Sequence, residues 1–168
     1  MKNIVMTRID DRLIHGQVMT AWLGYHQANE ILIIDNDLAD DDFTVMMMKS
    51  LVPKEIKLNV LNEKDASSYL LSPVGKEKII ILVKRPQVIE DEITNGVSIS
   101  DLNVGGMGMT TGRKKIFKNI TASNEEVACF RRLINLDVHV FVQVVPQDKA
   151  VALSNYCLLY TSPSPRDS

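Results

Sequence analysis

The chain has 168 residues, of which 45% are hydrophobic and 24% charged, and its formal net charge is -2. This length and apolar content suffice for one domain with its own core, without disulfides or a structural metal. A charge so close to zero argues against binding to nucleic acid or to an anionic membrane surface. The two cysteines, Cys129 and Cys157, have no CxxC spacing and no nearby histidines. This argues against a disulfide framework and a zinc site and favours the cytoplasm.

Short apolar runs alternate along the chain with helical patterns. Strands are predicted, in chain order, at 3–7, 30–34, 57–61, 78–83, 98–103, 115–120 and 137–142. Helices are predicted between and after them, at 16–27, 41–51, 63–70, 86–95, 123–135 and 147–155. The alternation predicts an α/β fold of three layers, with a mostly parallel central sheet of about six or seven strands and helices on both faces.

The composition changes abruptly near the C-terminus, where prolines alternate with serines in YCLLYTSPSPRDS. No amphipathic period continues through this segment. We therefore expect a single domain over residues 1–155. For residues 156–168 we expect either a non-native tail that replaces a C-terminal helix or a genuine disordered terminus.

The segment RIDDRLIHGQV, residues 8–18, follows the first predicted strand and enters the first predicted helix. In open α/β sheets, ligands bind beyond the carboxyl ends of the strands, so this segment is the first candidate site. Gly16 and Gln17 open the helix, and a helix N-terminus presents free amide groups to an anion such as phosphate. His15, immediately before them, is predicted to be a nucleophile toward phosphorus, although a histidine that merely lines a loop is the plainer alternative.

Charged residues flank this histidine on its N-terminal side. Arg8 and Arg12 offer guanidinium groups that match the oxygens of a phosphate. One of Asp10 and Asp11 is expected to orient the imidazole and to fix one of its tautomers. Two arginines, two carboxylates and a helix start around one histidine favour a catalytic site over a structural one.

The same segment resembles the phosphorylation-site motif of the IIB component of the mannose/fructose/sorbose family of the bacterial sugar phosphotransferase system. The resemblance runs from Met1 to about Asn155 and includes AWLG at 21–24, IDND at 34–37 and LNVGGM at 102–107. It implies that His15 is the phosphohistidine intermediate. The other motif positions that match the family are Arg8, Asp10, Asp11 and Arg12 as catalytic residues, and Arg12, Gly16 and Gln17 as phosphate-binding residues.

Membership of that family implies a protein-phosphohistidine sugar phosphotransferase. His15 then accepts a phosphoryl group from the phosphohistidine of a IIA protein and passes it to a sugar that enters through the membrane components IIC and IID. No metal and no other cofactor is implied, because the energy is already stored in the incoming phosphohistidine. The expected location is the cytoplasm, peripherally at the membrane transporter complex. Self-association is compatible with the family, and the sugar is not identified by the sequence.

Two other readings remain open at this point. An acidic pair after the first strand and Lys84 after the fourth suggest a receiver-like signalling domain. However, Asn62 stands at the end of the third strand, where such a domain needs an aspartate. A non-catalytic regulatory relative that keeps the loop for binding is the other reading. The basic residues 113–115 are expected to be docking charges or a solvated face.

Overall fold

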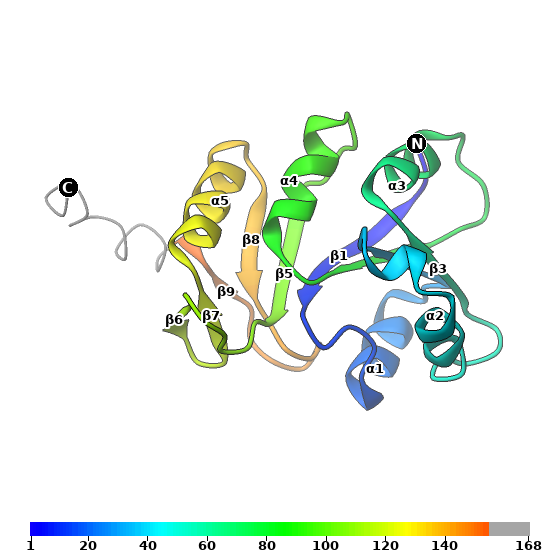
Figure 1. Ribbon diagram of the computed structural model, residues 1–168, viewed down its shortest axis with the longest axis horizontal. Coiled ribbons are helices and arrows are strands. Elements are labelled where there is room, and N and C mark those ends of the chain that lie inside the picture. The colour runs from blue at the N-terminus through cyan, green and yellow to red at the C-terminus, as the bar shows by residue number, and fades with distance from the viewer. Residues whose placement is uncertain (155–168) are drawn as a thin grey trace, which may run out of the picture.

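The structure is a computed structural model and describes residues 1–154. A seven-stranded sheet forms its centre, with the strand order β3-β2-β4-β1-β5-β8-β9 (Figure 1). All neighbouring strands pair in parallel except β8 and β9. The strands of this sheet are β1 (Ile4–Asp10), β2 (Glu30–Ile34), β3 (Lys57–Leu61), β4 (Ile79–Val83), β5 (Asp101–Gly106), β8 (His139–Val142) and β9 (Val151–Ala152). The predicted α/β fold class and the predicted strand number are confirmed.

Helices cover both faces of the sheet, as the alternating pattern predicts. The helices are α1 (Gly16–His26), α2 (Asp42–Lys49), α3 (Glu63–Leu71), α4 (Pro86–Thr94) and α5 (Asn124–Asn135), with a short 3-10 turn η1 (Leu38–Asp40) before α2. Helices α3, α4 and α5 form one layer and share a hydrophobic cluster with one face of the sheet. Helices α1 and α2 pack on the second cluster, on the opposite face.

The central strand β4 shows why the sequence folds this way. All five of its residues are buried. Alternate residues contribute to the two clusters, with Ile79 and Ile81 in one and Ile80 and Leu82 in the other. A continuous apolar run is what a parallel strand covered on both faces requires, because successive side chains point to opposite faces.

Four elements differ from the sequence prediction by three residues or more. The strand predicted at 98–103 is β5, which runs from Asp101 to Gly106. Strand β1 continues for three residues beyond the predicted end at Thr7, so Arg8, Ile9 and Asp10 belong to the strand and not to the loop. The predicted strand at 115–120 is a hairpin of β6 (Lys114–Phe117) and β7 (Ile120–Ala122), outside the main sheet. The predicted helix at 147–155 is wrong within the described chain, where β9 pairs with β8 instead.

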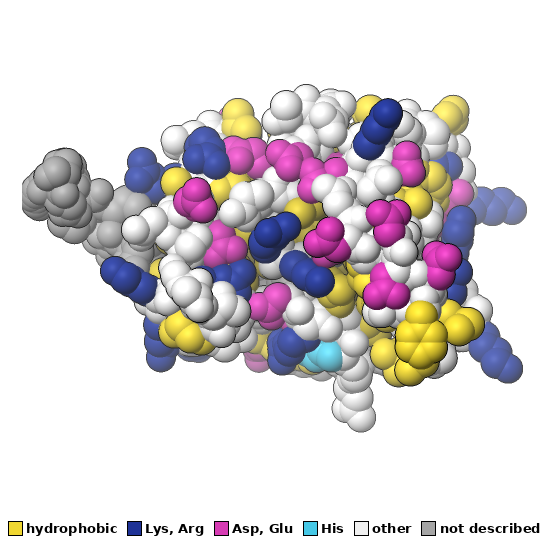
Figure 2. Space-filling view, in the orientation of Figure 1, with side chains coloured by type: hydrophobic (Ala, Val, Ile, Leu, Met, Phe, Trp, Pro, Cys, Tyr) yellow, Lys and Arg dark blue, Asp and Glu magenta, His cyan; other side chains and the backbone are white. Residues whose placement is uncertain are grey.

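The surface carries acidic and basic side chains side by side (Figure 2). Hydrophobic side chains gather over α2, where Phe43, Met46 and Met47 are exposed. Between residues 1 and 154, no helix is long and apolar enough to cross a bilayer. The predicted tail at 156–168 lies outside the described residues.

Candidate active site

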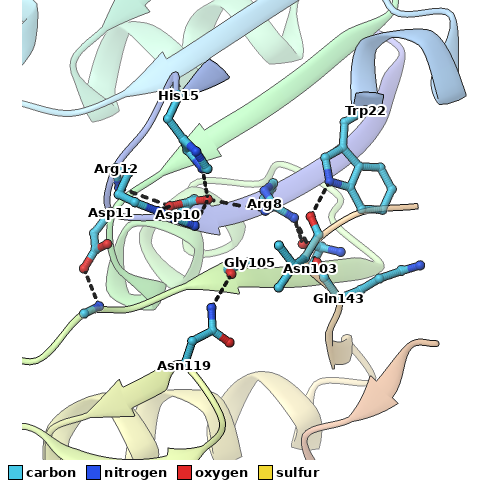
Figure 3. Close-up of polar contacts among 12 residues, drawn as sticks. Arg8, Asp10, Asp11, Arg12, His15, Trp22, Asn103, Gly105, Asn119 and Gln143 are labelled. Carbon is cyan, nitrogen blue, oxygen red and sulfur yellow. Dashed lines mark hydrogen bonds and ion pairs between the residues drawn. The ribbon is translucent and has the colours of Figure 1, made fainter. Parts of the chain in front are cut away.

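The last residues of β1 and the turn that follows it build the candidate site. Strand β1 lies in the middle of the sheet, between β4 and β5, so its carboxyl end opens onto the centre of one sheet edge. The chain then turns tightly, because the Leu13 amide donates to the Asp10 carbonyl at 2.9 Å. Leu13 has a φ of 58° and Gly16 a φ of 52°, both in the left-handed region. This turn brings His15 back over the end of the strand from which the chain came (Figure 3).

The carboxylate of Asp10 is the centre of the site and is 1% exposed. Its Oδ1 accepts hydrogen bonds from the backbone amide and from Nε of Arg12, both at 3.1 Å. Its Oδ2 accepts from His15 Nε2 at 2.8 Å, from Arg12 Nη2 at 3.2 Å and from Arg8 Nη2 at 3.3 Å (Figure 3). Burial alone would raise the pKa of Asp10. The hydrogen bonds from Arg12 and His15 and the charge of Arg8 outweigh burial, so this pKa lies below its ordinary value.

Within residues 1–154 the imidazole of His15 is held at one nitrogen only. Asp10 is ionised, so it can only accept, and the contact therefore places a proton on Nε2 of His15. In the neutral ring the lone pair is then on Nδ1, which has no hydrogen-bond partner among residues 1–154. The side chain is 26% exposed, so the ring reaches solvent while one edge is fixed. A partly exposed imidazole with a fixed tautomer is suited to nucleophilic attack.

Arg8 plays a different part from the one expected of it. Its side chain is fully buried and so does not face an incoming phosphate. Its Nη1 donates to Asn103 Oδ1 at 2.5 Å and to the Gln143 carbonyl at 3.0 Å, while Nη2 binds Asp10. The ring of Trp22 lies 5.5 Å from the guanidinium carbon. Burial lowers the pKa of Arg8, and its pairing with Asp10 partly offsets this effect.

The remaining predicted phosphate-binding groups lie on the solvent side of the site. The side chain of Arg12 is 51% exposed although it binds Asp10. Gly16 and Gln17 are exposed at the start of α1. His15 occupies the N-cap position of this helix but makes no capping hydrogen bond with its side chain. The first amide groups of α1 are therefore available to an anion beside the imidazole.

Asp11 is separate from this group. Its Oδ2 accepts from the Gly108 amide at 2.8 Å and from Arg113 Nη1 at 3.2 Å. Arg113 also forms a two-pronged pair with Glu126 of α5, at 2.9 and 2.8 Å. The prediction that Arg113 is a docking charge or solvated is therefore wrong: its side chain is 9% exposed and ties the loop after β5 to α5. Lys114 and Lys115 are exposed, as predicted.

Other polar residues at this sheet edge have structural partners. Lys84 forms an ion pair with Asp35 at 3.4 Å. Asn62, where a receiver-like domain needs an aspartate, accepts from the Asp65 amide and caps α3. Within residues 1–154 no group of three metal-ligating side chains is present. Trp22 and Asn103 lie in the AWLG and LNVGGM segments, but no sequence signal indicated that either residue contacts Arg8.

Comparison with known proteins agrees with this fold and shows the family. The family described as PTS system sorbose subfamily IIB component matches residues 4–163. The sorbose-specific EIIB component of Lacticaseibacillus casei is 33% identical over 146 residues, which are 86% of this chain and 89% of that protein. The fructose-specific EIIB component of Bacillus subtilis is 31% identical over 88% of this chain and 91% of its own length.

A solved structure extends the agreement to three dimensions. The IIBSor domain of the sorbose permease from Klebsiella pneumoniae superimposes with a TM-score of 0.88 at 30% identity. The match covers 95% of this chain and 98% of that domain. The chain therefore belongs to the sorbose subfamily of IIB components, in the mannose/fructose/sorbose family of the sugar phosphotransferase system.

Proposed function

We propose that this protein carries a phosphoryl group on His15 between a IIA protein and a sugar. The observation that supports this most directly is the contact of His15 Nε2 with the buried Asp10 carboxylate, which leaves Nδ1 of a partly exposed ring without a partner in the described chain. The donor is the phosphohistidine of the IIA component. The acceptor is a hydroxyl group of a sugar that enters through the membrane components IIC and IID, so the protein works in the cytoplasm beside them.

The transfer to His15 is a nucleophilic displacement at phosphorus. The Nδ1 lone pair forms the new N–P bond as the N–P bond to the donor imidazole breaks, and the donor nitrogen keeps that electron pair. His15 thereby gains positive charge, which the Asp10 carboxylate at 2.8 Å stabilises through the Nε2 proton. Arg12 and the first amides of α1 would stabilise the phosphoryl oxygens.

The second step regenerates the carrier. A sugar hydroxyl attacks phosphorus and loses its proton to solvent water, and the electron pair of the breaking N–P bond returns to Nδ1. The neutral ring with its proton on Nε2 is then the same species that Asp10 held at the start. No metal or nucleotide enters either step.

Labelling with phosphoenolpyruvate tests this proposal. The protein is mixed with phosphoenolpyruvate, the general phosphotransferase proteins and a IIA partner. The expected product is an acid-labile, alkali-stable label on His15, bonded through Nδ1 and detectable by 15N–31P coupling. His15→Gln should abolish the label, whereas His139→Gln, a matched change at an exposed histidine of β8, should retain it. A label that survives His15→Gln, or a wild-type protein that takes none, contradicts the proposal.

Arg12 provides a second, graded test. Arg12→Ala removes an exposed guanidinium group beside the phosphoryl position and should slow transfer about 100-fold, the usual effect of losing one donor to a developing charge. The same variant also loses two side-chain hydrogen bonds to Asp10. Arg12→Lys keeps a positive charge without the planar fork, so an intermediate rate is expected. Equal rates for Arg12→Ala and the wild type would exclude this role.

A further inference from the structure

We infer that Asn103 of β5 is a positioning residue for the transfer, acting on His15 through Arg8 and Asp10. This inference deepens the proposed function and rests on it. The polar chain begins at Asn103 Oδ1, which accepts from Arg8 Nη1 at 2.5 Å. It continues from Arg8 Nη2 to Asp10 Oδ2 at 3.3 Å and from the same oxygen to His15 Nε2 at 2.8 Å (Figure 3).

The orientation of the Asn103 amide indicates that this side chain serves to hold Arg8. A guanidinium group has only donors, so the amide must present its oxygen to Arg8. This leaves Asn103 Nδ2 buried without a hydrogen-bond partner among residues 1–154. An unsatisfied buried donor is destabilising. Position 103 of β5 therefore carries a destabilising unpaired donor, and the same side chain makes the hydrogen bond that fixes Arg8.

Strand β5 also provides the space in which Arg8 lies. Asn103 and Gly105 are two residues apart, so they face the same side of the strand. A Cβ atom at Gly105 would lie 2.6 Å from Arg8 Nη1 and would overlap the guanidinium carbon. The guanidinium thus occupies the place of a side chain at position 105, with the acceptor of position 103 beside it. Trp22 covers the same group at 5.5 Å.

The consequence for His15 concerns the direction of the Asp10 carboxylate. Arg8 Nη2 and His15 Nε2 share one oxygen of that carboxylate, so a displaced guanidinium changes the acceptor that holds the imidazole. Without a fixed acceptor, the neutral ring is free to carry its proton on either nitrogen. Molecules with the proton on Nδ1 cannot attack through that atom. Asn103 thereby sets the fraction of molecules that are ready to react.

Three variants separate positioning from simple support of the fold. Asn103→Leu removes the acceptor at similar volume, whereas Asn103→Asp keeps an acceptor for Arg8. Thr121→Val is the matched control, because it also removes a buried hydrogen bond, from Oγ1 to the Met107 carbonyl at 2.9 Å, but does not contact Arg8. The measurements are the His15 tautomer by 15N NMR, the rate of phosphoryl transfer from the IIA protein, and the midpoint of urea unfolding.

The expected pattern is specific. The wild type, Asn103→Asp and Thr121→Val should show the ring with its proton on Nε2, and Asn103→Leu should show a mixture of tautomers. Asn103→Leu should also lose about 100-fold in transfer rate, the effect expected when a reacting group is misplaced by roughly 1 Å. A wild-type tautomer and rate in Asn103→Leu would overturn the inference, even if unfolding is easier. If the wild type accepts no phosphoryl group, the proposed function fails, while the tautomer measurement still decides the role of Asn103.

Discussion

The substitution Gly105→Ala tests the packing of the buried guanidinium group most directly. The added methyl group would lie 2.6 Å from Arg8 Nη1, whereas non-bonded heavy atoms pack at about 3.5 to 4.0 Å. Arg8 must therefore move by roughly 1 Å or more to make room. The centroid of the Trp22 ring lies 5.5 Å from the guanidinium carbon, and such a shift of Arg8 disturbs the bonds to Asn103 and Asp10.

The magnitude follows from these contacts. Overpacking a core by one methyl group costs about 1 to 3 kcal/mol, and breaking a buried ion pair costs about 3 to 5 kcal/mol. Because the two effects share the same displacement, we expect a total loss of about 3 to 5 kcal/mol in the free energy of unfolding. A domain whose stability lies above the lower end of the ordinary range, about 5 to 15 kcal/mol, remains folded after that loss. Phosphoryl transfer should fall together with stability, because Asp10 loses its buried partner.

Urea unfolding followed by circular dichroism measures the loss, with Gly24→Ala as the control. Gly24 lies in α1, and a Cβ there meets no atom within 4 Å. The control should be neutral or more stable by up to about 1 kcal/mol, because alanine favours a helix over glycine. A loss below about 1 kcal/mol in Gly105→Ala, with normal transfer, would show that the guanidinium is not held as described.

Three further changes probe other parts of the molecule. Burial raises the pKa of Glu92 from 4.5 to about 7. The contribution of Glu92 to stability is therefore complete below pH 4.5 and is lost as the pH rises through 7. In unfolding curves measured at a series of pH values, Glu92→Gln should remove this contribution and be more stable than the wild type at pH 8 by up to about 3 kcal/mol. Arg113→Met leaves the buried carboxylate of Glu126 without its cation and should cost about 3 to 5 kcal/mol at pH 7. The pairing with Arg113 overcomes burial and lowers the pKa of Glu126 in the folded state. That loss should therefore begin to shrink as the pH falls below 4.5, where the unfolded chain takes up a proton, and should be gone once the pH is also below the lowered pKa of the folded state. Trp22→Phe loses the hydrogen bond from Nε1 to the Val144 carbonyl at 2.8 Å but keeps a ring over the guanidinium. The free energy of unfolding should fall by about 1 kcal/mol. Unchanged stability would contradict the value given to this hydrogen bond.

Strand β2, all of whose residues are buried, and its neighbour β3 are predicted well from sequence. The ranges predicted for β2 and β3, 30–34 and 57–61, agree with the structure at both ends. The end of β1 was missed because hydropathy marks Arg8 and Asp10 as loop residues. In the structure they are buried and form an ion pair, and Asn103 of β5 also accepts a hydrogen bond from Arg8. Such compensation depends on a partner about a hundred residues away and leaves no local pattern.

The candidate site, like the fold, could be predicted from the sequence only in part. The motif around His15 was sufficient to predict a carboxylate and Arg12 near the imidazole, because these residues lie within a few positions of it in the chain. The motif did not distinguish the two aspartates, which differ in their distant partners and not in their neighbours. Asp10 contacts His15, whereas Asp11 contacts Arg113. The β9 strand was predicted as a helix because its pairing with β8 is tertiary and its two residues carry no period of their own.

The turn between β1 and α1 is anchored at both ends, by the central strand before it and by the Trp22 bond to the Val144 carbonyl after it. Leu13 and Gly16 accept an uncommon backbone conformation inside this short span. The entropy cost of ordering the turn therefore arises during folding and not at each encounter with a partner. In the proposed function the protein meets two different partners in every cycle, and it would benefit from such rigidity at both, since neither meeting has to reshape the imidazole's surroundings.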